Sequence, residues 1–247
     1  MSSLAGFGLP ILTVYKLEKA KGDSASDTLA KNANIQRDIE YFSENVGKVN
    51  SVDDLFGDYK LMSFVLHAVD LGTEIQFSGR AKRALSERMD DPDALMNRLS
   101  DKRFKNAARV LELGETGVAT LKKPETIAEL KDLYVKMRYD DDLRRSTPEV
   151  SYAKYFEKNA GGIENYFDIL GDAQFREVVT KALGLPKELA YQDIDAQAAA
   201  IERRLSLDDL KKPEFVEKLT QRFLIMADQE RQQQGFGAQS YLLNLFV

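Results

Sequence analysis

Apolar residues recur along most of the chain at the spacing of one face of an α-helix. Leu61, Phe64, Val65, Ala68 and Val69 stand at i, i+3, i+4, i+7 and i+8, which is the pattern of an amphipathic helix. The same pattern is formed by Phe175, Val178, Val179, Ala182 and Leu183. The strict alternation that is typical of a β-strand is nearly absent. The sequence therefore predicts an all-α fold.

Three further segments carry helix signals. The stripe that begins near Pro124 is formed by Ile127, Leu130, Leu133, Tyr134 and Met137. Ala196–Leu205 is rich in alanine, a strong helix former. The last segment starts at Pro213, since proline is favoured at the first helical position, and its stripe is formed by Phe215, Leu219, Phe223 and Met226. We expect Gln232–Gly237 to break this final helix because it contains two glycines.

The helical pattern repeats within the chain. Residues 39–72 match residues 153–186 with a constant shift of 114 and no gap. Identical pairs include Tyr41 with Tyr155, Asn45 with Asn159, Gly57 with Gly171, and Asp58 with Asp172. Similar start signals at 99–104 and 210–215 place two helical modules, roughly 40 residues apart, in each half. The sequence thus predicts an internally duplicated array of helical modules that bury their apolar faces against one another.

The repeat divides the chain into five expected segments. These are an N-terminal arm (1–30), a first repeat half (31–118), a connecting helix (119–149), a second repeat half (150–235) and a C-terminal apolar tail (236–247).

Two aspartates stand just ahead of the matched helical faces. A carboxylate in that place accepts hydrogen bonds from the first free backbone N–H groups of a helix. We therefore interpret Asp58 and Asp172 as N-caps and not as catalytic carboxylates.

Composition excludes several kinds of site. The 35 basic and 40 acidic residues give a net charge of −5, whereas nucleic-acid binding needs a basic excess. Cysteine is absent and there is one histidine, so disulfides, thiolate chemistry and multi-histidine metal sites are excluded. The sequence contains neither a glycine-rich phosphate loop nor a G-x-S-x-G elbow. We predict no catalytic residue, no cofactor and no metal site.

The remaining polar candidates have simpler explanations. His67 lies between the apolar ridge positions of its helix, which indicates a partly exposed surface histidine. Asp140–Asp142 is followed by two arginines at pairing distance. Asp90–Asp93 indicates a turn into a helix that starts near Pro92. Neither acidic run has the alternating ligands and closing glutamate of a calcium loop.

Several turn-and-cap motifs resemble a known family. They are Tyr41-Phe42, the stretch from Asn45 to Leu55, Leu99–Phe104, Ala182–Pro186 and Gln221–Leu224. They resemble an alphaproteobacterial family of unknown function whose members often lie among flagellar and motility genes, and the resemblance covers most of residues 30–230. It implies a flagellum-linked accessory, assembly or structural role. No catalytic residue comes with it.

Both ends of the chain are apolar. Chain ends are usually polar and frayed unless they are tied down, so these segments must pack on the protein's own body or be covered by another chain. Under the second alternative, the candidate partner-binding residues are Leu9, Ile11, Leu12, Tyr241, Leu242, Leu245 and Phe246.

Two hypotheses about function follow. The first is a non-enzymatic interaction or structural protein that binds flagellar components or a second copy of itself. The alternative is a ligand- or metal-binding enzyme that uses carboxylates in a groove between the halves. We expect no nucleic-acid partner and no membrane span. The first 17 residues lack a basic start and a cleavage site, so we expect no cleavable signal and a cytoplasmic protein with flagellar association.

Overall fold

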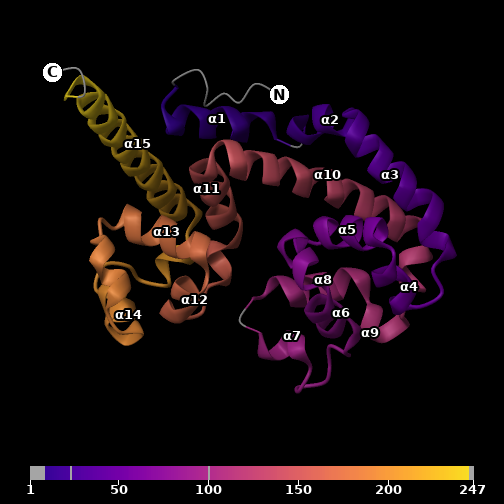
Figure 1. Cartoon of the computed structure of the whole chain (residues 1–247). Helices are drawn as coiled ribbons and strands as arrows, with labels where there is room; N and C mark the ends of the chain where they lie inside the picture. Colours follow the sequence, from indigo (N-terminus) through magenta and orange to yellow (C-terminus); the bar gives the residue numbers. More distant parts are fainter. Residues whose placement is uncertain (1–8, 23, 100, 245–247) are drawn as a thin grey trace. The chain divides into compact units, whose positions relative to one another are not determined.

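The computed structural model describes residues 9–22, 24–99 and 101–244 (Figure 1). Within these ranges every regular element is a helix, so the predicted all-α fold is confirmed. The chain divides into two compact units: unit 1 contains residues 1–21 and 142–247, and unit 2 contains residues 22–141. Within the same ranges, no helix combines the length and hydropathy needed to cross a bilayer.

Unit 2 is built from the helices between α2 and the first part of α10. Its α-helices are α2 (Ser24–Ala30), α3 (Ala33–Asn45), α4 (Val52–Gly57), α5 (Tyr59–Ala68), α6 (Ser78–Ser86), α7 (Leu95–Arg98), α8 (Arg103–Leu111), α9 (Leu113–Thr116) and α10 (Pro124–Ser146). Short 3₁₀ turns connect them at η2 (Val46–Lys48), η3 (Gly72–Phe77) and η4 (Thr120–Lys122). Helix α10 begins at Pro124, as the sequence predicts, and continues into unit 1.

Aromatic stacking forms the centre of the unit 2 core. The rings of Phe42 on α3 and Phe64 on α5 stack at 4.2 Å, and Tyr134 on α10 stacks on Phe64 at 4.1 Å. The Tyr134 hydroxyl donates a 2.6 Å hydrogen bond to Asp38, so its polar end is satisfied although the ring is buried. Burial and this carboxylate raise the pKa of Tyr134. Three helices are thereby joined through one column of rings.

Unit 1 combines the start of the chain with its second half. Its helices are α1 (Ile11–Lys21), the end of α10, α11 (Pro148–Asn159), α12 (Tyr166–Gly171), α13 (Ala173–Ala182), α14 (Ile194–Glu202) and α15 (Pro213–Asn244), with 3₁₀ turns η5 (Ala160–Gly162), η6 (Lys187–Tyr191) and η7 (Asp209–Lys211). Helix α15 packs against α11 and α13, and α1 lies against both α11 and α15 (Figure 1). The core centres on Phe156, Phe175 and Phe223.

Helix α15 corrects one expectation from the sequence. The helix runs unbroken from Pro213 to Asn244, so the predicted break at Gln232–Gly237 is wrong. Glutamine is a good helix former, and an isolated glycine costs only about 1 kcal/mol relative to alanine. Two such glycines do not end a helix that no proline interrupts.

Helix α7 also starts later than expected, at Leu95 and not near Pro92. The intervening residues form a turn, in which the backbone N–H of Asp93 donates to the Asp91 side chain.

The same hydrogen bonds recur in the two units at the shift of 114. The hydroxyl of Tyr41 donates to Asp58, and that of Tyr155 donates to Asp172. A backbone hydrogen bond spanning five residues also follows each of the helices α5 and α13. The N–H of Leu71 donates to the carbonyl of Leu66, and the N–H of Leu185 donates to the carbonyl of Thr180. Internal duplication stays a prediction, which these contacts support.

Candidate functional site

Asp58 and Asp172 act as helix caps, as the sequence predicts. One oxygen of Asp58 accepts from the backbone N–H groups of Lys60 (2.9 Å) and Leu61 (3.0 Å). Its other oxygen accepts from the Tyr41 hydroxyl at 2.7 Å. Partial burial opposes ionisation, but the hydrogen bonds from Leu61, Tyr41 and Lys60 outweigh it and hold the pKa of Asp58 below its usual value. Both oxygens therefore have structural partners.

Asp172 has the same arrangement at the start of α13. Its carboxylate accepts from the N–H groups of Gln174 (2.8 Å) and Phe175 (3.1 Å) and from the Tyr155 hydroxyl (2.8 Å). Tyr41 thus links the cap of α5 to α3, and Tyr155 links the cap of α13 to α11.

The other acidic candidates are engaged in local pairs. Asp142 forms an ion pair with Arg145 at 3.6 Å. Asp90 is held by two hydrogen bonds from Arg88, at 2.9 and 2.8 Å, and the Arg88 side chain lowers the pKa of Asp90. Among the described residues, no group of three or more His, Asp or Glu side chains could hold a metal ion.

His67 is half-buried near the end of α5. Its Nδ1–H donates to the Ser63 carbonyl at 2.8 Å, and its ring lies edge-on to Tyr134. The ring also lies against Gly72, where an added Cβ would come within 2.8 Å of it. The histidine is partly exposed, as the sequence predicts, and these contacts give it a packing role.

The predicted partner-binding residues at the start of the chain lie against their own unit. Ile11 is fully buried, and Leu9 and Leu12 are half-buried against the unit 1 core. The backbone N–H of Ile11 donates to Asp228 on α15 at 3.3 Å, and Lys19 pairs with Glu157 on α11 at 3.1 Å. These contacts fasten α1 to unit 1. A role in partner binding stays a prediction for these residues.

The predicted residues at the other end can be placed only in part. Tyr241 and Leu242 belong to α15 by their backbone, and the structure does not describe their side chains. Leu245 and Phe246 lie outside the described residues altogether.

Sequence reasoning missed an exposed apolar pair in unit 1. Tyr191 ends η6 with 91% of its surface exposed, and Ile194 begins α14 with 56% exposed. Phe167 on α12 is also exposed, and α12 packs against α14. Ile194 stands at helical spacing with the buried residues Ala198 and Ile201 of α14, yet it is exposed. Apolar spacing alone therefore gives no signal that identifies the pair.

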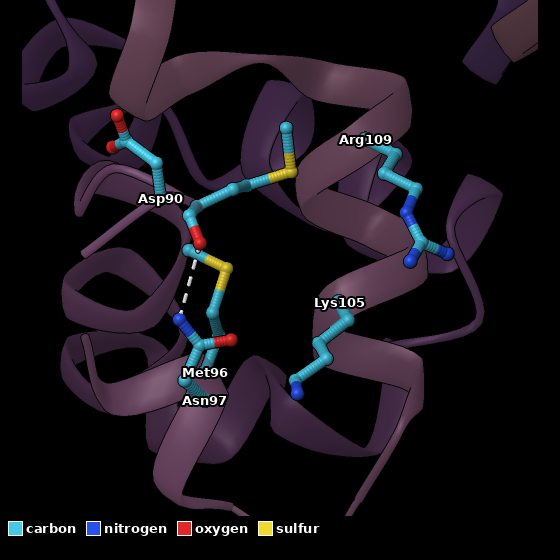
Figure 2. A pocket seen from close by; sticks show the side chains of 6 residues that line it. Asp90, Met96, Asn97, Lys105 and Arg109 are labelled. Carbon is cyan, nitrogen blue, oxygen red and sulfur yellow. Dashed lines mark hydrogen bonds between the residues drawn. The ribbon is translucent and has the colours of Figure 1, made fainter. Parts of the chain in front are cut away.

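Sequence reasoning also missed a pocket of about 420 Å³ in unit 2 (Figure 2). Its lining combines two methionines, two cations, a carboxylate and an amide: Met89, Asp90, Met96, Asn97, Lys105 and Arg109. The cations come from α8, whereas the other residues come from α7 and the loop before it. In Figure 2, Lys105 extends toward the segment that carries Asn97, and the carboxylate of Asp90 points away from both cations.

Hydrogen bonds fasten the loop that forms one wall of this pocket. The side-chain amide of Asn97 donates to the carbonyls of Met89 (3.1 Å) and Asp91 (2.7 Å). The backbone N–H of Met89 donates to Glu115 at 2.9 Å, and Glu115 also pairs with Arg88 at 3.3 Å. The wall is therefore built by the fold of unit 2.

Comparison with known proteins finds one family model and one similar solved structure. A comparison of the sequence with curated proteins finds no match. The fold is similar to the crystal structure of a protein from Agrobacterium tumefaciens, with a TM-score of 0.71 and 29% sequence identity over 87% of this chain and 91% of that one. Residues 68–216 match the model of a family described as "Protein of unknown function (DUF1217)". Because this match spans more than half of the sequence, the chain belongs to the DUF1217 family.

Proposed function

We propose that this protein is a non-enzymatic partner-binding protein that acts as an accessory or structural component. One observation carries the proposal: the exposed apolar pair of Tyr191 (91% exposed) and Ile194 (56% exposed) on unit 1. Single exposed apolar residues are ordinary on protein surfaces, whereas grouped ones mark interaction sites. Here two such residues stand three positions apart in the sequence, and exposed Phe167 lies on α12, which packs against α14. We take these residues as parts of one surface.

The charge around this pair indicates the chemistry of the partner. Glu188, Asp193 and Asp195 flank it and are exposed, whereas the exposed Lys187 is paired with Glu230 at 3.5 Å. Acidic side chains around an apolar centre favour a partner segment in which apolar residues are flanked by Lys or Arg. Tyrosine suits such a contact because its ring is a rigid apolar surface with a polar end. The proposed partner is therefore a basic amphipathic segment.

The carboxyl groups whose pKa is shifted have structural partners. Each carboxyl group with a shifted pKa in the described residues is shifted downward and takes part in a cap or an ion pair. A general acid at neutral pH needs a raised pKa. The enzyme alternative thus receives no support from this set of groups.

The sequence resemblance supports a flagellar partner. Members of the family that the cap motifs resemble often lie among flagellar and motility genes. We therefore propose a component of the flagellar apparatus as the partner that carries the basic segment.

Affinity purification of the tagged protein from motile cells tests the proposal. We compare the wild type with the double variant Tyr191→Ser/Ile194→Ser and with Tyr59→Ser, which removes a 67% exposed tyrosine from unit 2. Losing the burial of two apolar side chains should weaken co-purification of a flagellar component more than tenfold, whereas Tyr59→Ser should leave it unchanged. Equal recovery from all three proteins would contradict the proposal.

A further variant tests the terminal segment. Deletion of residues 238–247 removes Tyr241, Leu242, Leu245 and Phe246, which are candidates from the sequence. If only this deletion abolishes recovery, the partner binds the end of the chain and not the exposed pair.

A further inference from the structure

We propose that the pocket of unit 2 binds an amphiphilic anion. A carboxylate or phosphate-ester group would be held by Lys105 and Arg109, and an aliphatic body would lie on the thioether side chains of Met89 and Met96. This inference is independent of the proposed partner surface, which lies on unit 1.

Two cations stand on the side of the pocket that α8 forms, with Lys105 extending toward the Asn97 segment and Arg109 extending away from it in Figure 2. They stand at i and i+4 on α8, so their side chains leave the same face of the helix. Within the part of the chain that the structure describes, Lys105 has no ion pair, and Arg109 makes a hydrogen bond only to the neutral side chain of Asn106, at 3.1 Å. An ammonium and a guanidinium that no carboxylate neutralises can both donate charge-assisted hydrogen bonds to an anion.

The carboxylate in the lining does not cancel this charge. Asp90 is paired with Arg88 through both of its oxygens. Its side chain also points away from Lys105 and Arg109 (Figure 2). The lining therefore keeps a net positive charge on the side formed by α8.

The methionines give the opposite side an apolar character. Met89 is half-buried and supplies the more accessible apolar surface, whereas Met96 is almost fully buried and borders the cavity from within the core. Methionine side chains are flexible and polarizable, so they adapt to aliphatic chains of different shape. The volume of about 420 Å³ lies within the range of small-molecule sites, roughly 300–1,000 Å³. Cations on one side and thioethers on the other match a ligand with one acidic end.

Methionine methyl resonances report on this pocket directly. The chain has six methionines, so protein labelled with ¹³C at the methionine methyl groups gives a simple NMR spectrum. Octanoate, octyl phosphate and neutral octanamide are titrated into the full chain. Matched variants are Lys105→Gln and Arg109→Gln, with Lys31→Gln as the control because Lys31 is an exposed lysine of the same unit.

The proposal expects saturable shifts of the Met89 and Met96 signals with at least one of the two anions. The signals of Met62, Met137 and Met226 should stay in place. Octanamide should bind roughly tenfold or more weakly, and each pocket variant should weaken binding by a similar factor, while Lys31→Gln should not change it. The two anions show whether the site prefers a carboxylate or a phosphate ester.

Three results would overturn the proposal. The first is the absence of a shift with both anions. The second is equal affinity for octanamide, which would remove the role of the charge. The third is unchanged affinity in Lys105→Gln and Arg109→Gln, with the methionine spectrum showing that both variants are folded.

Discussion

At the scale of single residues, capping aspartates fix where the helices of each unit begin. Asp58 joins the first turn of α5 to Tyr41 on α3 through three hydrogen bonds. Asp172 does the same for α13 and Tyr155 on α11. One side chain thus satisfies free backbone donors and also fixes a helix pair.

Removing either cap should destabilise the protein. Asp58→Ala and Asp172→Ala should each lower the free energy of unfolding by about 1 kcal/mol, within a range of roughly 0.5–2. Asparagine keeps a capping oxygen, so Asp58→Asn and Asp172→Asn should cost less. Urea denaturation followed by circular dichroism measures these differences, and an alanine variant as stable as the wild type would refute the capping role.

The Asp58 cap should also make stability depend on pH. Its pKa is lower in the folded protein than in the unfolded chain. Its ionised form therefore contributes stability that is fully present above about pH 4 and is lost as the pH falls through the folded-state pKa. The stability difference between wild type and Asp58→Asn should shrink below pH 4. A difference that stays constant from pH 7 to pH 2 would count against this linkage.

A close backbone approach should make Gly114 sensitive to substitution. A Cβ at this position would lie 2.1 Å from the Glu87 carbonyl oxygen, at the base of the loop that borders the pocket. Gly114→Ala should cost about 1–3 kcal/mol, since the backbone must shift. Gly79→Ala in α6 is the matched control because nothing lies within 4 Å of the added atom, and it should be neutral or stabilising. Thermal melting that ranks the two variants in the opposite order would contradict this reading.

At the scale of elements, α1 is an integral part of unit 1. Ile11, Val14 and Tyr15 are buried against helices that follow them by more than 100 residues in the sequence. Burial and the nearby Glu157 raise the pKa of Tyr15, which keeps the hydroxyl protonated.

Shortening the buried side chain of Ile11 at the start of α1 should therefore reduce the stability of the protein. Ile11→Ala removes a fully buried side chain and should cost about 2–5 kcal/mol. Leu17→Ala, at a position 41% exposed on the same helix, should change stability by no more than about 0.5 kcal/mol. Chemical denaturation measures both, and equal costs would mean that α1 is not anchored through Ile11.

Local signals made much of this helical structure predictable from the sequence. The caps Asp58 and Asp172 act within three residues, and Pro124 and Pro213 mark helix starts by their own geometry. The continuity of α15 was not predictable in this way. It depends on whether the low helix propensity of two glycines exceeds the stability of all the other residues of the helix.

The surface sites could not be derived from periodicity. Met89, Met96 and Lys105 form one pocket only after two helices and a loop have packed. The exposure of Tyr191 is likewise a result of tertiary packing, which leaves its ring uncovered.

At the scale of the whole molecule, each unit has its own hydrophobic core. Phe42 lies in the core of unit 2, and Phe156, at the position 114 residues later, lies in the core of unit 1. Both side chains are fully buried.

Two matched core variants should therefore have local effects. Phe42→Ala and Phe156→Ala should each cost about 3–5 kcal/mol. Hydrogen exchange followed by mass spectrometry should show faster exchange chiefly in unit 2 for the first variant and in unit 1 for the second. The same increase throughout the chain for both variants would show one cooperative structure.

Photo-cross-linking in motile cells tests the proposed partner binding most directly. A photoreactive phenylalanine analogue replaces Tyr191 in one strain and Tyr59 in another, so that two exposed tyrosines of different units are compared. The proposal predicts a cross-link from position 191 to a flagellar component, through a segment rich in Lys or Arg, and no such product from position 59. Absence of a product from position 191, or the same product from both positions, would contradict it.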